Sequence, residues 1–196
     1  MVDAKVEAKI TVNELTDEES AAINSSSAHP MGNPLNLQHW GRPPAKIADK
    51  LWIGGLYDAI NLPLLAKLRI GAIVNVMGPL IPQLGITQTI QPVPVCVVPD
   101  GVSYASFTTL QPFGQTLQNA KTAVQAIKFY RDQIGVNVFV HCGEGRDRGP
   151  TIIWKYLVEG GATPEVAKEM LKSRSIAIVH EDWWNGAGNE TGQPTQ

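Results

Sequence analysis

Apolar residues recur in two distinct periods from about residue 47 onward, and these periods predict strands that alternate with helices. Short apolar runs rich in β-branched residues predict strands at residues 51–53, 72–76, 93–98 and 136–140. From residue 112 to residue 133 the apolar positions repeat every three or four residues, which predicts one long amphipathic helix. Gly135 follows this repeat and is expected to end the helix.

Capping residues predict further helices on both sides of that one. Asn61 is expected to cap a helix that holds Pro63 in its first turn. Thr163 is expected to cap another helix, with Pro164 at its first position. A third helix is predicted at residues 150–159, directly after a loop rich in glycine.

Helices that alternate with short apolar strands predict an α/β fold with a largely parallel central sheet flanked by helices. Residues 1–45 hold few large apolar residues in sequence, which predicts a flexible N-terminal arm. Residues 46–185 are expected to form a single domain, and residues 186–196 a loose polar tail. Ligands of such sheets bind at the carboxyl ends of strands, and the glycine-rich loop after Val140 occupies that position.

Composition and charge are those of a soluble globular protein. The chain has 196 residues, of which 43% are hydrophobic and 17% charged, and a formal net charge of −2. This balance gives no reason to expect nucleic acid or an anionic membrane as a partner. Two cysteines, Cys96 and Cys142, cannot build a disulfide framework and suit a reducing compartment. Because no secretory signal or membrane-spanning run is present, we expect a cytoplasmic protein without a membrane span.

The segment HCGEGRDRGPT, residues 141–151, has the features of a phosphate-binding site. A loop wrapped round a helix N-terminus presents successive backbone N–H groups to a dianion, and the helix dipole and nearby arginines favour a thiolate at Cys142. Arg148 can offer two parallel N–H donors to phosphoryl oxygens, which a lysine cannot copy. The backbone can approach a ligand closely at three glycines, Gly143, Gly145 and Gly149.

The His-Cys-x5-Arg pattern of this segment resembles the phosphate-binding loop of the protein tyrosine phosphatase superfamily. Residues 51–76, LWIGGLYDAINLPLLAKLRIGAIVNV, are similar to the opening of dual-specificity phosphatase domains, and residues 156–174, YLVEGGATPEVAKEMLKSR, to their closing helices. The resemblance covers roughly residues 46–180. It implies a phosphatase-type domain that hydrolyses phosphomonoesters through a cysteinyl-phosphate intermediate, without a metal or an organic cofactor.

The resemblance also implies roles for individual residues. Cys142 would be the nucleophile and Arg148 the phosphate clamp, while His141 would orient and tune Cys142. Asp100, in a Val-Pro-Asp-Gly segment similar to the family's acid loop, would be the general acid, worth roughly 10²–10⁴ in rate. Asn75 would brace the loop. The other residues that would surround the phosphate are Gly143, Glu144, Gly145, Arg146, Asp147 and Gly149.

The chain departs from the family pattern at two points. Family members usually carry serine or threonine directly after the arginine, where this chain has Gly149, so hydrolysis of the phospho-enzyme is expected to be slow unless Thr151 supplies the hydroxyl. Glu144 and Asp147 bring acidic charge into a loop meant for a dianion. Their spacing resembles the myotubularin group of phosphoinositide phosphatases, which makes Asp147 an alternative to Asp100 as the acid.

The sequence leaves several functions open. A phosphoprotein carrying phosphotyrosine, phosphoserine or phosphothreonine is the first choice of substrate, a phosphoinositide the second, and a phosphorylated RNA end the third. The expected partner is therefore a phosphorylated protein or a small phosphomonoester. A catalytically impaired phosphate-binding module is a rival from another class, since Gly149 and Glu144 could mark lost turnover. A rhodanese-like enzyme is a second rival, suggested by the Arg-Gly-Pro sequence at residues 148–150.

Other polar and aromatic residues are expected to have structural roles. His180 and the acidic cluster at residues 17–19 are expected to face solvent. Trp183 and Trp184 are expected to cover an edge of the core, and Cys96 to be a buried core thiol.

Overall fold

The computed structural model of the chain describes residues 14–26, 43–77, 101–107, 109, 115–172 and 177–184. The strands are β1 (Ala45–Ala48), β2 (Leu51–Gly54), β3 (Ile70–Asn75), β4 (Ser103–Ser106) and β5 (Asn137–His141). The α-helices are α1 (Asp17–Ser26), α2 (Leu56–Ala59), α3 (Leu62–Lys67), α4 (Gln115–Ile127), α5 (Arg148–Glu159) and α6 (Pro164–Leu171). A π-helical segment, η1 (Lys128–Ile134), continues α4, and a 3-10 turn, η2 (Glu181–Trp183), lies near the end of the described chain.

The strands form one mixed sheet in the order β1-β2-β5-β3-β4. β1 runs antiparallel to β2, whereas β2, β5, β3 and β4 run parallel to one another. The predicted α/β fold with a largely parallel sheet flanked by helices is therefore confirmed. β5, the last of the described strands, lies in the middle of the sheet between β2 and β3, which both come from the first half of the chain.

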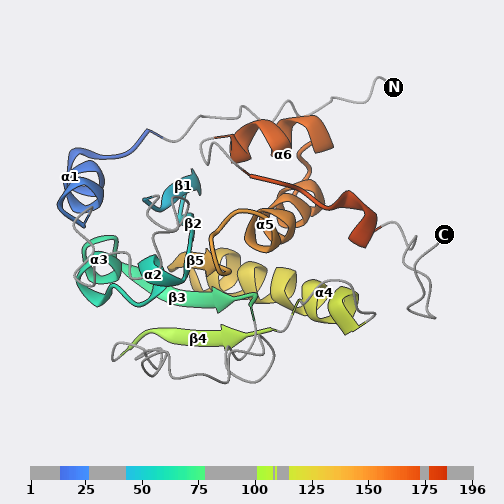
Figure 1. Ribbon diagram of the computed structural model, residues 1–196, viewed down its shortest axis with the longest axis horizontal. Helices are drawn as coiled ribbons and strands as arrows, with labels where there is room; N and C mark the ends of the chain where they lie inside the picture. Colours follow the sequence, from blue (N-terminus) through green and yellow to red (C-terminus); the bar gives the residue numbers. More distant parts are fainter. Residues whose placement is uncertain are drawn as a thin grey trace, which may run out of the picture.

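Helices cover the sheet on two sides, with α1, α2 and α3 on one and α4, α5 and α6 on the other (Figure 1). Alternation along the central strand explains both layers: Val138 and Val140 pack with the core of α4–α6, and Phe139 between them packs with the core of α1 and α3. Burial on both faces is typical of parallel strands. No helix within the described ranges has the length and apolar character needed to cross a membrane.

Helix boundaries agree with the capping residues. The side chain of Asn61 accepts a hydrogen bond from the N–H of Leu64, and that of Thr163 from the N–H of Val166. Gly135 ends η1 with a φ of +81°, a left-handed conformation that favours glycine. The predicted N-caps and the predicted helix end are therefore confirmed.

The expected flexible arm is wrong for α1. Ala22 and Ile23 of this helix are buried in the core of α1 and α3, and Glu19 forms an ion pair of 2.8 Å with Lys46 of β1. These partners lie well beyond the helix in the sequence, so the local composition alone did not indicate them.

The edge strand β4 and the residue Trp184 test two further expectations. β4 was not predicted, because its Ser-Tyr-Ala-Ser sequence is mostly polar and exposed, as an edge strand tolerates. Trp184 packs against the core of α4–α6, as expected. The predicted strand at residues 93–98, with Cys96, lies outside the described residues, as do Asp100 and the predicted tail.

Candidate active site

The central strand delivers Cys142 to the carboxyl edge of the parallel sheet. His141, the last residue of β5, is paired in register with Gly54 at the end of β2 and with Asn75 at the end of β3. Residues 142–148, here called the phosphate loop, therefore begin at the edge where three parallel strands end together. The sequence predicted this placement from the order of strand, loop and helix.

The sulfur of Cys142 lies against the first turn of α5. Cys142 is only 3% exposed, and a Cβ built on Gly149 would lie 3.8 Å from its Sγ atom. Gly145 has a φ of +67°, so the loop turns back onto the helix through a conformation that favours glycine. The first turn of a helix has unpaired N–H groups and the positive end of the dipole, which favour negative charge at this sulfur and on any bound anion.

The guanidinium group of Arg148 returns across the loop toward its beginning. Its Nη2 atom would lie 3.7 Å from a Cβ built on Gly143, the residue after Cys142. Within the part of the chain that the structure describes, no carboxylate or carbonyl group forms an ion pair or hydrogen bond with Arg148. The side chain is half-buried and lies near the residue that follows Cys142, which leaves its guanidinium donors available to an anion.

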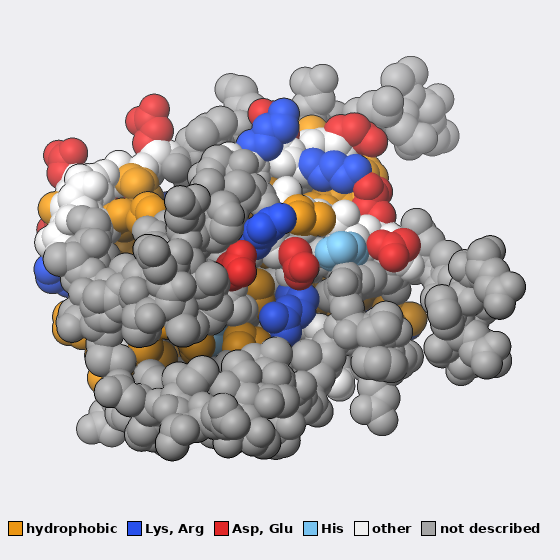
Figure 2. All heavy atoms as spheres, viewed as in Figure 1, with side chains coloured by type: hydrophobic (Ala, Val, Ile, Leu, Met, Phe, Trp, Pro, Cys, Tyr) orange, Lys and Arg blue, Asp and Glu red, His pale blue; other side chains and the backbone are white. Residues whose placement is uncertain are grey.

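Each acidic side chain of the phosphate loop lies near a basic side chain other than Arg148. Glu144 Oε2 lies 4.0 Å from an Nη atom of Arg146, and Asp147 Oδ2 lies 3.7 Å from Nε2 of His180. Figure 2 shows acidic, basic and histidine side chains together on this face of the molecule. The side chain of Asp147 does not cap α5.

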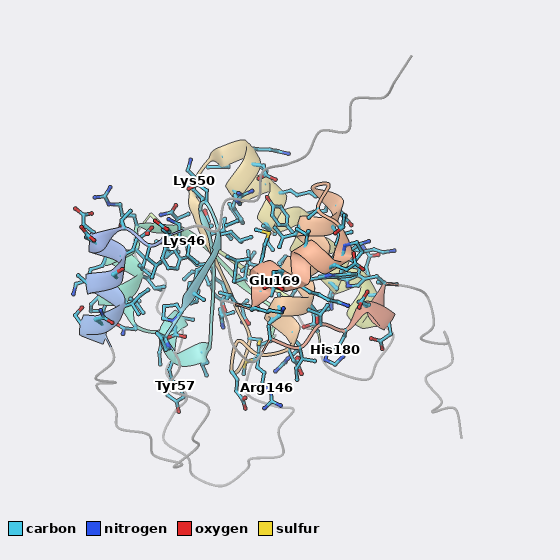
Figure 3. The ribbon with its side chains drawn as sticks, turned by 90° about the horizontal axis from the view of Figure 1, so that it is seen from above. Lys46, Lys50, Tyr57, Arg146, Glu169 and His180 are labelled. Atoms are coloured by element: carbon cyan, nitrogen blue, oxygen red, sulfur yellow. The ribbon has the colours of Figure 1, made fainter. Side chains whose placement is uncertain are left out.

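The segment at residues 177–180 runs beside the phosphate loop and is bonded to it. The N–H of Ile178 donates to the carbonyl of Arg146 at 2.8 Å, and the N–H of His180 donates to Thr151 Oγ1 at 3.0 Å. Figure 3 shows Arg146 and His180 near one another at one edge of the molecule, away from Lys50. The expectation that His180 simply faces solvent is wrong, because its side chain is only 25% exposed and lies against the loop.

The hydroxyl group of Thr151 is already engaged. It donates to the backbone carbonyl of Asp147 at 2.8 Å and accepts from the N–H of His180. A hydroxyl has a single proton to donate, so Thr151 does not have one left for a departing thiolate at Cys142. The structure therefore argues against Thr151 as the replacement for the missing family hydroxyl.

His141 acts on the backbone of Cys142 rather than on its sulfur. Its Nδ1 atom lies 3.3 Å from the carbonyl oxygen of Cys142, and its ring lies beside that of Phe139, on the face of the sheet that carries α3. Burial lowers the pKa of His141 to about 4; the contact with the Cys142 carbonyl opposes this effect and the charge of Arg148 adds to it. Among the described residues no hydrogen bond joins this ring to Sγ, so the expected tuning of the sulfur is replaced by a buried neutral imidazole at the strand end.

Asn75 does not brace the phosphate loop with its side chain, which corrects another expectation. Its amide nitrogen donates to Tyr104 Oη at 2.8 Å and to Ser106 Oγ at 3.2 Å, and its amide oxygen accepts from the N–H of Met77. The side chain thus joins β3 to β4, the neighbouring edge strand.

The turn after β2 supports the loop, a role that the sequence analysis missed. The N–H of Leu56 donates to the carbonyl of Gly143 at 2.8 Å. The turn is itself held by Asp58, whose Oδ2 accepts from the N–H of Gly55 at 2.8 Å. The available signal was a glycine pair that ends a strand, followed three residues later by an acid, which is typical of a helix start.

Comparison with known proteins gives matches in structure only. No protein-family model matches the chain, and no curated protein matches it in sequence. Human DUSP28 matches with a TM-score of 0.56 at 19% identity, covering 74% of this chain and 89% of that one. A mouse putative dual specificity phosphatase complexed with zinc tungstate matches with a TM-score of 0.54 at 23% identity, and the match covers 72% of this chain and 82% of that one. PTPMT1 in complex with PI(5)P matches with a TM-score of 0.53 at 20% identity, and the match covers 72% of this chain and 90% of that one. The chain therefore has the dual-specificity phosphatase fold, as the resemblance in its sequence implied.

Proposed function

We propose that the chain is a cysteine-dependent phosphatase that hydrolyses phosphomonoesters through a cysteinyl-phosphate intermediate. The observation that carries this proposal is the placement of Cys142 Sγ against the first turn of α5, with the Arg148 guanidinium folded back toward Gly143, the residue after Cys142. A nucleophilic sulfur and donors for a dianion thus converge at the carboxyl edge of the sheet. The structural neighbours, which are phosphatases by name, support the same chemistry.

The proposed reaction has two displacement steps. In the first, the Cys142 thiolate attacks phosphorus, the bond from phosphorus to the leaving oxygen breaks, and a general acid gives its proton to that oxygen. In the second, water attacks the cysteinyl-phosphate, the sulfur–phosphorus bond breaks, and the same residue takes a proton from the water. Arg148 and the N–H groups of the loop would stabilise the phosphoryl charge in both transition states.

Asp100 remains our candidate for the general acid, with Asp147 as the alternative. Asp100 comes from the segment that resembles the family's acid loop. The carboxyl group of Asp147 has another contact in the structure, with His180. This contact gives Asp147 a role that does not require it to deliver a proton to the substrate.

A phosphorylated protein is the substrate class that the loop supports best. Within residues 143–148 two acids balance two arginines and there is no lysine, so the loop does not offer the excess of positive charge that a polyanionic headgroup favours. A phosphoinositide is the second candidate, because the PTPMT1 neighbour is complexed with PI(5)P. We further propose a reducing, cytoplasmic setting, in which Cys142 stays a thiol.

Hydrolysis of p-nitrophenyl phosphate by the purified full chain tests the proposal. We expect wild-type turnover, no turnover above background for Cys142→Ser, and a loss of about 10²–10³-fold in kcat/KM for Arg148→Lys, which keeps the charge but loses the fork of donors. Arg69→Lys is the matched control, because Arg69 is exposed and immediately precedes β3. It therefore lies at the end of this strand that is opposite the candidate site.

Two results would contradict the proposal. Tungstate binding without any turnover would indicate a phosphate-binding module, and sulfur transfer from thiosulfate would indicate the rhodanese-like alternative. A panel of phosphopeptides and phosphoinositides, with Cys142→Ser as the blank, then decides between the two substrate classes.

A further inference from the structure

The acids of the phosphate loop raise a question about anion binding. Two carboxylates, from Glu144 and Asp147, lie in a loop whose proposed ligand is a dianion. Asp147 directly precedes Arg148, so its carboxylate is close enough in the chain to compete with phosphate for that guanidinium. The structure must therefore hold this carboxylate elsewhere if Arg148 is to act as the clamp.

The contact that holds it comes from His180. Asp147 Oδ2 lies 3.7 Å from Nε2 of His180, while Oδ1 is buried without a hydrogen-bond partner among the described residues. No other donor within the described ranges reaches this carboxyl group. Both side chains are partly buried, at 25% exposed for His180 and 39% for Asp147, so the pair is only partly screened by solvent.

The backbone of the segment at residues 177–180 fixes His180 in this position. One hydrogen bond joins Ile178 to the carbonyl of Arg146, the residue before Asp147. A second joins the N–H of His180 to Thr151, whose hydroxyl in turn donates to the carbonyl of Asp147. His180 is thus anchored both to the loop and to α5, so its imidazole meets Asp147 from a constrained backbone and not from a loose surface chain.

We propose that His180 is a positioning residue of the phosphate loop, which draws the Asp147 carboxylate toward the segment at residues 177–180 and leaves Arg148 available to the anion. Glu144 lies near Arg146 and Asp147 lies near His180, and among the described residues no ion pair joins either carboxylate to Arg148. The inference extends the proposed function, but its main test is anion binding and does not need turnover.

The test measures tungstate binding, because tungstate is an inorganic dianion that mimics phosphate. Isothermal titration at pH 6, where an imidazole carries substantial positive charge, compares variants of the full chain. We expect His180→Gln to weaken binding by roughly threefold to fivefold, the scale of a partly exposed ion pair, and His180→Lys to restore it to within about twofold. Asp147→Asn alone should tighten binding, because it removes a negative charge that repels the dianion even when it is held near His180.

A double-mutant cycle separates this role from a general effect on folding. In an Asp147→Asn background, His180→Gln should change tungstate affinity by less than about 1.5-fold, since no carboxylate is left to position. An equal loss in both backgrounds would overturn the inference, as would failure of Asp147→Asn to tighten binding or of the wild type to bind tungstate. The Asp147→Asn result stands even if the His180→Gln variant does not fold.

Kinetics with p-nitrophenyl phosphate separate this inference from the proposed function. If the chain is a phosphatase, His180→Gln should raise KM by the same roughly threefold to fivefold factor and leave kcat within about twofold of the wild type. Absent turnover with His180-dependent tungstate binding would overturn the proposed function and leave the inference standing. Turnover with a KM that does not respond to His180→Gln would overturn the inference alone.

Discussion

Gly149 is the residue at which the site differs most plainly from the family pattern. A Cβ at this position would lie 3.8 Å from Cys142 Sγ and 3.3 Å from Cδ1 of Ile53, so a short side chain would contact the sulfur after a small shift of the isoleucine. The hydroxyl that family members place here would be within hydrogen-bond reach of the departing thiolate. Its absence is expected to make breakdown of the phospho-enzyme the slow step.

Gly149→Ser should therefore increase turnover. If breakdown of the intermediate is limiting, one hydrogen bond to the leaving thiolate is expected to raise kcat by about tenfold or more. Rapid-quench measurements should show a burst and an accumulated phosphocysteine in the wild type, and less of both in the variant. Gly149→Ala is the matched control, because it adds the same Cβ against Ile53 without a hydroxyl. Equal effects of serine and alanine would contradict this account.

His141 is expected to make the fold sensitive to acid. Burial lowers its pKa in the folded state to about 4, whereas an unfolded histidine titrates near its ordinary value of 6.5. Between these two values the unfolded chain binds more protons than the folded one, so the free energy of unfolding falls as the pH is lowered through this window. The contribution is about 3 kcal/mol at most.

Urea denaturation at pH 7 and at pH 4.5 measures this effect. We expect His141→Gln to lose less stability between the two values than the wild type does, because glutamine has no proton to gain. The comparison uses the change with pH within each protein, so a general loss from the substitution does not affect it. An unchanged pH dependence in the variant would show that other groups cause the acid sensitivity.

At the scale of elements, the phosphate loop depends on segments that flank it in space. At the start of α2, the N–H of Leu56 donates a hydrogen bond to the carbonyl of Gly143. In the segment at residues 177–180, the N–H of Ile178 donates to the carbonyl of Arg146. Both hydrogen bonds take loop carbonyls as acceptors. They hold these oxygens on the outside of the loop, so that its N–H groups can face the proposed anion site.

Asp58 is expected to couple fold stability to activity through this turn. It is 6% exposed and accepts the N–H of Gly55, so Asp58→Ala leaves a buried donor unpaired and should lower the free energy of unfolding by about 1–3 kcal/mol. Because the same turn holds Gly143, kcat/KM for p-nitrophenyl phosphate should fall as well. Asp58→Asn keeps an acceptor oxygen and should retain most of both quantities. Loss of stability with unchanged kcat/KM would separate the turn from the site.

Local patterns predicted many of the elements but not all of them. The caps at Asn61 and Thr163 act within one helical turn, so the sequence alone located those helix starts. In contrast, α1 has a buried face only because β1 and the core of α3 meet it, and β4 is held as an exposed edge strand by β3. Neither partner lies next to these elements in the chain, so no local period indicated them.

At the scale of the whole molecule, sheet order creates the site. β5 enters between β2 and β3, which both precede it by more than 60 residues in the sequence, and this places Cys142 at a shared carboxyl edge. This edge brings together three segments: the turn after β2, the phosphate loop and the segment after α6. The site is therefore assembled from three distant parts of the sequence around one central strand.

The sequence by itself determined the chemistry of the loop. Cys142, the glycines and Arg148 lie within eight consecutive residues, and the backbone conformation and dipole that suit a phosphate site arise from residues a few positions apart. Only the tertiary structure decided the partners: His180 beside Asp147, Thr151 engaged by the loop carbonyl, and Asn75 joined to β4. The physical reason is the separation of these partners along the sequence. Hydrogen bonds and ion pairs between distant segments form only when the elements that carry them pack together, and this packing depends on the surface that the whole sheet buries.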